Sequence, residues 1–303
     1  MSRIIRIVTS SFATLEQVRP PFNLRTPAIE ENVRLAEELL TAATAYRPDI
    51  VLLPETFAFA GMSAAEIEHV AEPVGGPIHE MLSSTARKGS MNLVAGHLVR
   101  DGSRIVNRAL VFDRSGELVG AYDKMHPVGN ERLAGVIPGS RVGVVDLDVG
   151  RVGLAVCFDI NWPAIWAQFA AQGVDFVCWI SAYDGGFPLQ SYAWQHQYPI
   201  VSSVYTYHAR LYDIASDVVT LTSRWQRLGY CELNLDRALF HTDNQMDRIL
   251  ALQKKYGDQV AVRTYTEEHL FILESRALEL SIRDIIAEFG LETYRDYIRR
   301  CTE

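Results

Sequence analysis

Three polar residues stand where strand-like runs end: Glu55 follows VLLP, Lys124 follows GAYD, and Cys157 follows VGLAV. The ends of strands are where α/β folds build their sites. Taken singly, each residue has an ordinary explanation, because cysteine is often a small buried residue and charged residues at strand ends are usually solvated. As a set they are more specific, because a thiol nucleophile needs a base for its proton and a cation for the oxyanion that it creates. The three residue types therefore predict nucleophilic attack on a carbonyl carbon.

The elements that must position these residues alternate between strands and helices. A β-branched run and an amphipathic segment open the chain, and Thr26-Pro27 supplies a helix start signal. Asp101-Gly102 is a hairpin turn signal between two strand-like runs. Strands are expected at 3–10, 50–53, 91–99, 104–112, 142–147, 152–158 and 175–180, with another ending at Tyr122, and helices at 27–46, 77–88, 163–172, 243–256 and 277–299. This alternation predicts α/β layering.

Composition narrows the class of protein. The chain has 303 residues, 29 Lys plus Arg against 37 Asp plus Glu, and a net charge of −8, with 48% hydrophobic and 22% charged residues. This is ordinary globular composition, and an acidic chain without a basic run argues against nucleic acid as a partner. Neither a signal-peptide core nor an apolar run of membrane-spanning length is visible, so we expect a soluble, cytoplasmic protein that does not bind a membrane.

The four cysteines are far apart and show neither CxxC nor Cys/His ligand spacing. They are also too few for a disulfide framework in a chain of this length. We therefore expect neither a structural zinc site nor disulfides. A reduced compartment leaves a cysteine available as a nucleophile.

Five segments, in this order and at this spacing, resemble the nitrilase superfamily of carbon-nitrogen hydrolases. They are VLLPE (51–55), EPVGGP (72–77), NRALVFDRSGELVGAYDKMHP (107–127), PGS (138–140) and GRVGLAVCFDINWP (150–163). The superfamily has a Glu, Lys, Cys triad in that chain order, and the resemblance places Glu55, Lys124 and Cys157 in those roles. It implies a single-domain αββα sandwich of two mixed β-sheets flanked by helices, assembly into a homodimer or higher homo-oligomer, and no metal or organic cofactor.

The chemistry of these residue types agrees with the roles that the resemblance implies. The Cys157 thiolate would attack an amide carbonyl, and the Lys124 ammonium and the backbone N–H of Phe158 would stabilise the oxyanion. Glu55 would take the thiol proton, pass it to the departing amine, and later activate water against the thioester. Glu55 should raise the pKa of the thiol and Lys124 should lower it, so the groups titrate together.

Further site residues come from the loops after the same strands. Glu131 matches the place where the superfamily often has a second glutamate, although a surface glutamate beside Arg132 is an equal alternative. Asn161, Trp162 and Tyr183 are candidates for binding substrate. Trp194 and His196, on an expected helix, are interpreted as packing residues.

Two domain-level expectations follow. Residues 1–270 are expected to form the hydrolase domain, and 271–303 a C-terminal helical extension that packs on a partner subunit. Apolar residues in the helix after the nucleophile, Ile165, Trp166 and Phe169, are a second candidate surface for self-association. The alternative is that this face packs on its own sheet.

Departures from the superfamily's usual residues bear on the substrate. Amidase-like members commonly have arginine at the position of Asn161, and true nitrilases commonly have Trp-Glu in place of Phe158-Asp159. We therefore expect a thiol hydrolase acting on a small, uncharged amide or N-carbamoyl compound, unless Arg210 or Arg224 supplies a cation. The alternatives are a catalytically silent binding or assembly subunit and a nitrilase acting on a nitrile. A papain-like protease is a weaker option, because its cysteine signature is absent.

Overall fold

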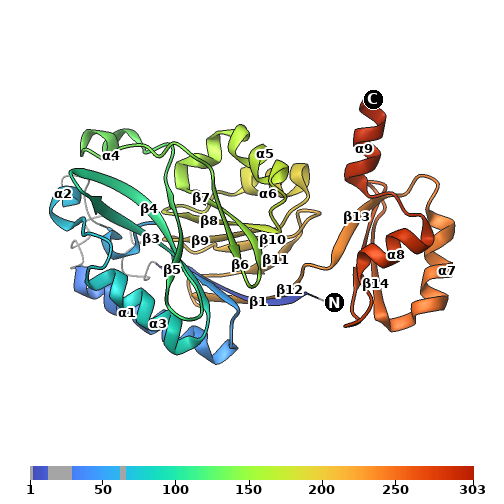
Figure 1. Ribbon diagram of the computed structural model, residues 1–303, viewed down its shortest axis with the longest axis horizontal. Coiled ribbons are helices and arrows are strands. Elements are labelled where there is room, and N and C mark those ends of the chain that lie inside the picture. Colours follow the sequence, from blue (N-terminus) through green and yellow to red (C-terminus); the bar gives the residue numbers. More distant parts are fainter. Residues whose placement is uncertain (1–2, 13–28, 62–65) are drawn as a thin grey trace. The chain divides into compact units, whose positions relative to one another are not determined.

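The computed structural model describes residues 3–12, 29–61 and 66–303 (Figure 1). It divides into two compact units. The larger comprises Arg6–Cys231, and the smaller comprises Glu232–Glu303 with the first residues of the chain. Strands β1 (Ile4–Ser10) and β12 (Leu228–Asn234) run across this division.

Two mixed six-stranded sheets form the larger unit. The first has the order β12-β1-β2-β3-β4-β5 and the second the order β11-β10-β9-β8-β7-β6. The pairs β1–β2, β2–β3, β7–β8 and β8–β9 are parallel, and the described pairs outside them are antiparallel. The remaining strands are β2 (Ile50–Leu52), β3 (Asn92–Asp101), β4 (Arg104–Phe112), β5 (Leu118–Asp123), β6 (Gly143–Leu147), β7 (Gly150–Val156), β8 (Phe176–Ser181), β9 (Ile200–Val204), β10 (Arg210–Tyr212) and β11 (Val218–Leu221).

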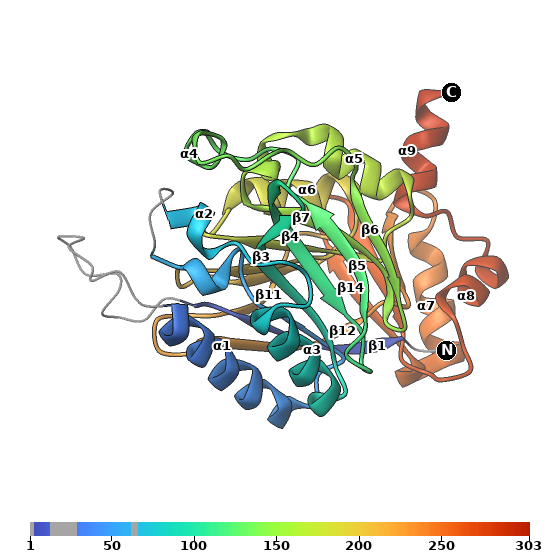
Figure 2. The same cartoon turned by 60° about the vertical axis from the view of Figure 1, so that its left-hand side comes forward.

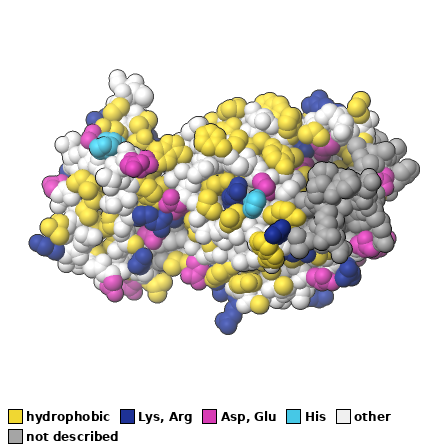
Figure 3. Space-filling view, turned by 180° about the vertical axis from the view of Figure 1, so that it is seen from behind, with side chains coloured by type: hydrophobic (Ala, Val, Ile, Leu, Met, Phe, Trp, Pro, Cys, Tyr) yellow, Lys and Arg dark blue, Asp and Glu magenta, His cyan; other side chains and the backbone are white. Residues whose placement is uncertain are grey.

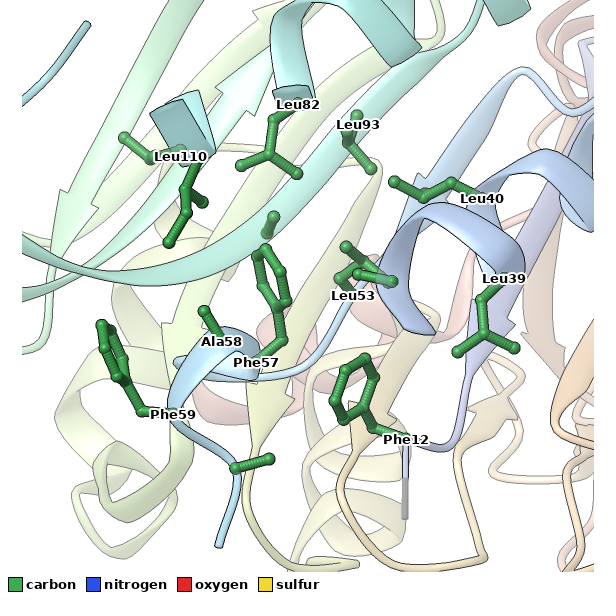
Figure 4. Close-up of a cluster of buried hydrophobic side chains, with 14 of the residues drawn as sticks. Phe12, Leu39, Leu40, Leu53, Phe57, Ala58, Phe59, Leu82, Leu93 and Leu110 are labelled. Atoms are coloured by element: carbon green, nitrogen blue, oxygen red, sulfur yellow. The ribbon is translucent and has the colours of Figure 1, made fainter. Parts of the chain in front are cut away.

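Helices cover the outer face of each sheet (Figure 2). Helices α1 (Ile29–Ala43) and α3 (Pro77–Gly89) bury their apolar sides against the first sheet. Figure 4 shows this core, where Leu40 and Leu82 from the helices approach Leu53, Leu93 and Leu110. Helices α5 (Pro163–Ala171) and α6 (Phe187–His196) cover the second sheet. The expected class, two mixed sheets flanked by helices, is confirmed.

The two sheets meet through hydroxyl groups as well as apolar side chains. The Oγ atoms of Ser10 in β1 and Ser203 in β9 lie 3.1 Å apart, and Ser203 Oγ also donates to the backbone oxygen of Ser10 at 2.9 Å. Both serines are fully buried. Their mutual hydrogen bonds satisfy polar groups that would be costly to bury alone.

Some sequence expectations are refined here. The helix expected at 27–46 is α1 followed by a 3₁₀ turn at Thr44–Tyr46, and Thr26-Pro27 lies outside the described residues. The apolar residues Ile165, Trp166 and Phe169 are at most 2% exposed and belong to the core of the second sheet. They pack within their own unit, so they offer no surface for self-association. Self-association of the protein itself stays a prediction.

The smaller unit has its own sheet and core. Its antiparallel strands have the order β13-β15-β14, and its core includes Phe240, Leu252, Phe271 and Ile285. Its elements are β13 (Arg237–His241), α7 (Met246–Tyr256), β14 (Val260–Tyr265), β15 (Leu270–Ser275), α8 (Ile282–Phe289) and α9 (Tyr294–Thr302).

This unit differs from the helical extension expected at 271–303. The expected boundary at 270/271 falls inside β15, whereas the compact units divide after Cys231. The helix expected at 277–299 is two helices, because Gly290 takes a left-handed backbone conformation (φ 59°) and its N–H closes α8 on the carbonyl of Ile286. Glycine is the residue that most readily ends a helix in this way.

Surface and helix properties bear on two further expectations. On the coloured part of the face in Figure 3, Lys and Arg side chains lie singly or in small groups rather than in one continuous basic patch. The expectation that nucleic acid is not a partner stays a prediction. Within the described ranges, no helix combines the length and the apolar character that crossing a bilayer requires.

Candidate active site

The structure brings Glu55, Lys124 and Cys157 to one cavity of about 230 Å³. Glu55 follows β2 and Lys124 follows β5 of the first sheet, whereas Cys157 follows β7 of the second. Glu131, from helix α4 (Gly129–Leu133), lines the same cavity. The exposed fractions of Glu55, Lys124 and Cys157 are only 4%, 1% and 7%. Each sheet therefore supplies part of one buried polar site.

Close backbone packing fixes the turn that carries Glu55. The N–H of Gly96 in β3 donates to the carbonyl of Pro54 at 3.2 Å. A Cβ atom at Gly96 would lie 2.5 Å from Glu55 Cα, so only glycine allows this approach. The next residue, Thr56, has a left-handed φ of 37°, and its carbonyl accepts a hydrogen bond from Tyr205 Oη at 2.8 Å. The turn is thus fixed on both sides of the carboxylate.

Lys124 joins two carboxylates. Its Nζ atom lies 2.7 Å from Glu55 Oε1 and 2.7 Å from Glu131 Oε2. Its backbone is also anchored, because its N–H donates to Asn107 O at 2.8 Å and its carbonyl accepts from Gly139 N at 2.9 Å. The ammonium can therefore face the cavity with little freedom to move.

Asn107, in the middle of β4, makes a second bridge between the same carboxylates. Its Nδ2 atom donates to Glu55 Oε1 and to Glu131 Oε1, both at 2.7 Å. Glu131 also accepts from Val128 N, and Glu55 Oε2 accepts from Ala182 N at 3.0 Å. Two like charges share one ammonium and one amide, which offsets their repulsion. Sequence reasoning missed Asn107, and the available signal was a polar residue inside the apolar strand RIVNRALVF.

Cys157 begins a 3₁₀ turn (Cys157–Asn161) directly after β7 and has a left-handed φ of 48°. Trp179 Nε1 donates to its carbonyl at 3.1 Å. Its thiol interacts with the side chains of Ser181 and Glu55. The N–H of Phe158 lies in the first turn of this helix, where backbone donors lack intrahelical acceptors.

The charges of the site set the protonation of the thiol and the amine. Burial and the negative charge of Glu55 raise the pKa of Cys157, and Lys124 and Ser181 offset only part of this rise. Burial alone would lower the pKa of Lys124, but the negative charges of Glu55 and Glu131 outweigh burial and raise the pKa. At neutral pH the site therefore holds a neutral thiol beside an ammonium. A base must remove the thiol proton before attack, and Glu55 is in contact with it.

The nucleophile turn also contains a fully buried carboxylate, Asp159. It accepts hydrogen bonds from Tyr122 Oη at 2.7 Å, from Val156 N at 3.2 Å, and from His126 N and Nδ1 at 3.0 and 2.8 Å. The sequence reasoning used Asp159 only as a departure from Trp-Glu. The side-chain partners, Tyr122 and His126, are 37 and 33 positions away in the chain, so no local signal could have identified them.

The three candidate substrate-binding residues lie outside the described lining of the cavity. Asn161 is exposed and donates to Phe158 O at 3.0 Å, and Trp162 stacks on His126 with ring centroids 3.5 Å apart. Tyr183 is 38% exposed, and its pKa is raised by burial and by the charges of Cys157 and Glu55. His196 stacks on Tyr192 within α6, and Trp194 lies in the same helix.

The rest of the cavity is mainly apolar. Lys124 is the one Lys or Arg in the described lining, and it is already paired with two carboxylates. Arg210 donates to Tyr212 Oη, and Arg224 lies over the ring of Trp225, so neither supplies a cation there. The apolar lining residues are Phe59, Ile67, Val70, Leu98, Val128 and Ala182. The uncharged polar lining residues are Thr56, Asn130 and Tyr205. In the part of the chain that the structure describes, no group of His, Cys, Asp and Glu could hold a metal ion.

Comparisons with known proteins match the part of the chain that contains Glu55, Lys124 and Cys157. The profile of the family described as carbon-nitrogen hydrolase matches residues 13–238. The human deaminated glutathione amidase is 28% identical over 173 residues, covering 52% of this chain and 53% of that protein. A bifunctional nitrilase/nitrile hydratase of Lupinus angustifolius is 30% identical over 162 residues, covering 47% and 46%. The chain thus spans about half the length of the curated relatives that it matches.

Solved structures show the same fold. Nit3 of Saccharomyces cerevisiae, described as a member of branch 10 of the nitrilase superfamily, superposes with a TM-score of 0.66 at 17% identity, covering 84% of this chain and 95% of that one. The Nesterenkonia AN1 amidase, solved as a mutant with a cysteine replaced by alanine, gives 0.67 at 19% identity, covering 84% and 97%. At these identities the structural likeness establishes the fold.

Proposed function

Since the chain belongs to the carbon-nitrogen hydrolase family of the nitrilase superfamily, we propose that it hydrolyses the C–N bond of a small, uncharged amide or N-carbamoyl compound through a thioester at Cys157. The observation that carries this proposal is the meeting of Glu55, Lys124 and Cys157 at one buried cavity. Each residue has the neighbours that its role requires. The proposed products are a carboxylic acid, or a carbamic acid from a carbamoyl compound, and ammonia or an amine.

The first half of the reaction forms the thioester. Glu55 accepts the thiol proton as Cys157 Sγ attacks the carbonyl carbon, and the oxyanion binds Lys124 Nζ and the N–H of Phe158. When the tetrahedral intermediate collapses, the C–N bond breaks and Glu55 returns the proton to the leaving nitrogen. The raised pKa of the thiol supports the need for this base, because few thiolates form without it.

The second half releases the acid. Glu55, again a carboxylate, takes a proton from water, whose oxygen attacks the thioester carbon. The same oxyanion donors stabilise the second intermediate, the C–S bond breaks, and the proton returns to Cys157 sulfur. Glu131 keeps Lys124 charged and oriented through its 2.7 Å ion pair. Asn107 donates to both carboxylates and so fixes their positions relative to each other.

Size and charge of the cavity support the substrate class. Its volume of about 230 Å³ is below the range of about 300–1,000 Å³ that is common for drug-sized ligands, so the acyl group should be small. A second carboxylate on the substrate would meet mainly apolar side chains, the buried Glu55 and Glu131, and the uncharged polar Thr56, Asn130 and Tyr205, with no unpaired cation in the described lining. An uncharged acyl chain fits this surface better.

The test is release of ammonia or amine from a panel of small amides, ureido acids and nitriles, with Cys157→Ala as the control. The decisive comparison is kcat/KM for a neutral amide against its ω-carboxylate analogue. We expect a preference of about 100-fold for the neutral amide, equivalent to about 2.7 kcal/mol. A preference of that size for the carboxylate would contradict the substrate class.

Two other outcomes would replace the proposal. Rapid hydrolysis of nitriles with slow hydrolysis of amides would identify a nitrilase. No turnover of any compound, together with no adduct at Cys157 by mass spectrometry, would favour a catalytically silent subunit. We further propose that the protein is cytoplasmic and self-associates, and light scattering showing a fully active monomer of 34.0 kDa would contradict self-association.

A further inference from the structure

We propose that Asp159 is a positioning residue that locks the Cys157 turn to the segment carrying Lys124, and so sets the geometry between nucleophile and oxyanion cation. The inference rests on the proposed function for its kinetic part. It starts from one carboxylate, 0% exposed, that receives four hydrogen bonds from two separate parts of the chain.

One of these hydrogen bonds closes the nucleophile turn. Val156 N donates to Asp159 Oδ2 at 3.2 Å across Cys157. Cys157 has φ 48°, a conformation that is unfavourable for a non-glycine residue and persists only where its surroundings impose it. The bond from Val156 spans the strained residue, so the Asp159 carboxylate helps to impose that backbone.

The other three hydrogen bonds reach the lysine segment on both sides of Lys124. Tyr122 Oη donates to Oδ2 at 2.7 Å, and His126 donates to Oδ1 from its backbone N at 3.0 Å and through Nδ1 at 2.8 Å. Tyr122 Oη also accepts from Met125 N at 3.3 Å. Residues two before and two after Lys124 are therefore tied to the same carboxylate.

Ring packing supports the same connection. The His126 ring stacks on Trp162, which follows the nucleophile turn, with an interplanar angle of 7°. The contacts of Asp159 and His126 together span the second sheet's nucleophile turn and the first sheet's lysine segment. The described cavity lining includes neither Asp159 nor Tyr122 nor His126, so this cluster acts on the site without binding substrate.

The sharpest variant is Asp159→Asn, made in a Cys301→Ser background because Cys301 is exposed and would also react with thiol reagents. An asparagine keeps the shape of the side chain but has only one acceptor oxygen. It therefore cannot replace both carboxylate oxygens, one of which accepts from Val156 N and the other from His126. We expect kcat to fall about 100-fold with KM within about 3-fold of the parent, because a displacement near 1 Å at the reacting groups costs about that much.

A second measurement does not need a substrate. The rate of Cys157 alkylation by iodoacetamide, followed by mass spectrometry at about pH 8, reports directly on the thiol. If Asp159 acted only through its charge, removing that charge would lower the thiol pKa and speed alkylation. Positioning predicts the opposite, a slowing of about 10-fold, because Lys124 no longer lies where it stabilises the thiolate.

Matched variants complete the design. Asp123→Asn removes a carboxylate from the same segment, but one that pairs with Arg108, so both rates should stay within about 2-fold of the parent. Tyr122→Phe and His126→Phe each remove one side-chain donor to Asp159 and keep an aromatic ring. Each should lower kcat and the alkylation rate about 3- to 10-fold, which tests the proposal even if Asp159→Asn does not fold.

The outcomes separate this inference from the proposed function. Slower alkylation in the variants supports positioning even if no amide is hydrolysed by the parent. Alkylation at or above the parental rate in the folded Asp159→Asn variant would overturn it. So would a rise in KM at unchanged kcat, or parental rates in both Tyr122→Phe and His126→Phe.

Discussion

The turn that carries Glu55 and the turn that carries Cys157 each contain a left-handed backbone residue, and different contacts support the two turns. Both follow strands, β2 and β7, and both contain a non-glycine residue with left-handed φ, Thr56 at 37° and Cys157 at 48°. Packing against Gly96 and the Tyr205 hydroxyl hold the first turn. A buried carboxylate, Asp159, holds the second.

The difference teaches where each kind of support can be used. The Glu55 turn carries a negative charge, so a further carboxylate beside it would add repulsion, and close backbone packing is the better support. The Cys157 turn carries a neutral thiol, and Asp159 is not among the described lining residues of the cavity. Close backbone packing and one tyrosine hydroxyl support the turn of the base, and a buried carboxylate supports the turn of the nucleophile.

Of the variants in the two turns, removal of the nucleophile should have the largest effect on kcat. Cys157→Ala should lower kcat by at least about 10⁴-fold, because the oxyanion donors and the cavity remain but no thioester can form. Steady-state kinetics on a confirmed substrate measures this. Cys178→Ala is the matched control, since Cys178 is also buried but outside the described cavity lining. Near-normal turnover by Cys157→Ala with loss in Cys178→Ala would show that the nucleophile is misassigned.

Removing either charged side chain beside the thiol should lower kcat, whereas the pKa of the thiol should move in opposite directions in the two variants. Glu55→Gln and Lys124→Met should lower kcat, by about 10³-fold and at least about 10²-fold. Their effects on the pKa of Cys157 should be opposite, because Glu55 raises that pKa and Lys124 lowers it. Alkylation should therefore begin at lower pH in Glu55→Gln and at higher pH in Lys124→Met.

The control for this pair is Arg132→Met, which removes a positive charge from outside the described lining of the cavity. Its alkylation profile should match that of the parent. Shifts in the same direction for Glu55→Gln and Lys124→Met would contradict the electrostatic account. Complete, rapid turnover by Glu55→Gln without a thioester adduct would rule out the general-base role.

A smaller effect should come from the packing that supports Glu55. In Gly96→Ala the new Cβ would lie 2.5 Å from Glu55 Cα and 2.6 Å from Thr56 N, so the turn must move. We expect a loss of about 1–3 kcal/mol in the free energy of unfolding and about 10-fold in kcat. Denaturant titration and kinetics measure both. Gly129→Ala, where no atom lies within 4 Å of the added Cβ, should leave stability unchanged, and equal losses in both variants would refute the steric argument.

The smallest effect should come from one hydroxyl. Tyr205→Phe removes the hydrogen bonds of Tyr205 Oη with Thr56 O at 2.8 Å and with Thr56 Oγ1 at 2.7 Å. Because both partners are part-buried, we expect the free energy of unfolding to fall by about 1 kcal/mol and kcat to fall about 3-fold. Thr56→Val is the reciprocal test, since it removes only the side-chain bond. An unchanged unfolding midpoint in Tyr205→Phe would show that packing alone supports the turn.

The ends of the strands could be predicted because a run of apolar residues is a pattern of neighbouring residues, and its end can be read directly from the sequence. The runs before Glu55, Lys124 and Cys157 are apolar in the sequence, and the motifs give their chain order. The partners of these residues could not be predicted in the same way. Asn107 and Asp159 act through contacts 52 and 37 residues away in the chain. Strand pairing within the first sheet creates the Asn107–Glu55 pair, and docking of the second sheet on the first creates the Asp159–Tyr122 pair.

The smaller unit was missed for a related reason. Strands β13 and β15 pair across about thirty residues, with helix α7 and strand β14 between them, and β14 reads VAVRTY with polar residues in its second half. Such a segment carries a weak strand signal, because its stability depends on long-range pairing. Helical periodicity at 277–299 is the stronger local pattern, and it favours the helical extension expected at 271–303.

The hydroxyl bridge between the two sheets has a consequence for how the chain acquires its chemistry. Ser10 and Ser203 are 193 positions apart, so their contact closes only after most of the larger unit has been synthesised and folded. Contacts of such large sequence separation form late and slowly. Since the carboxylates come from one sheet and the thiol from the other, a half-folded chain has a cysteine without its base. Recovery of activity on refolding should therefore lag behind recovery of secondary structure.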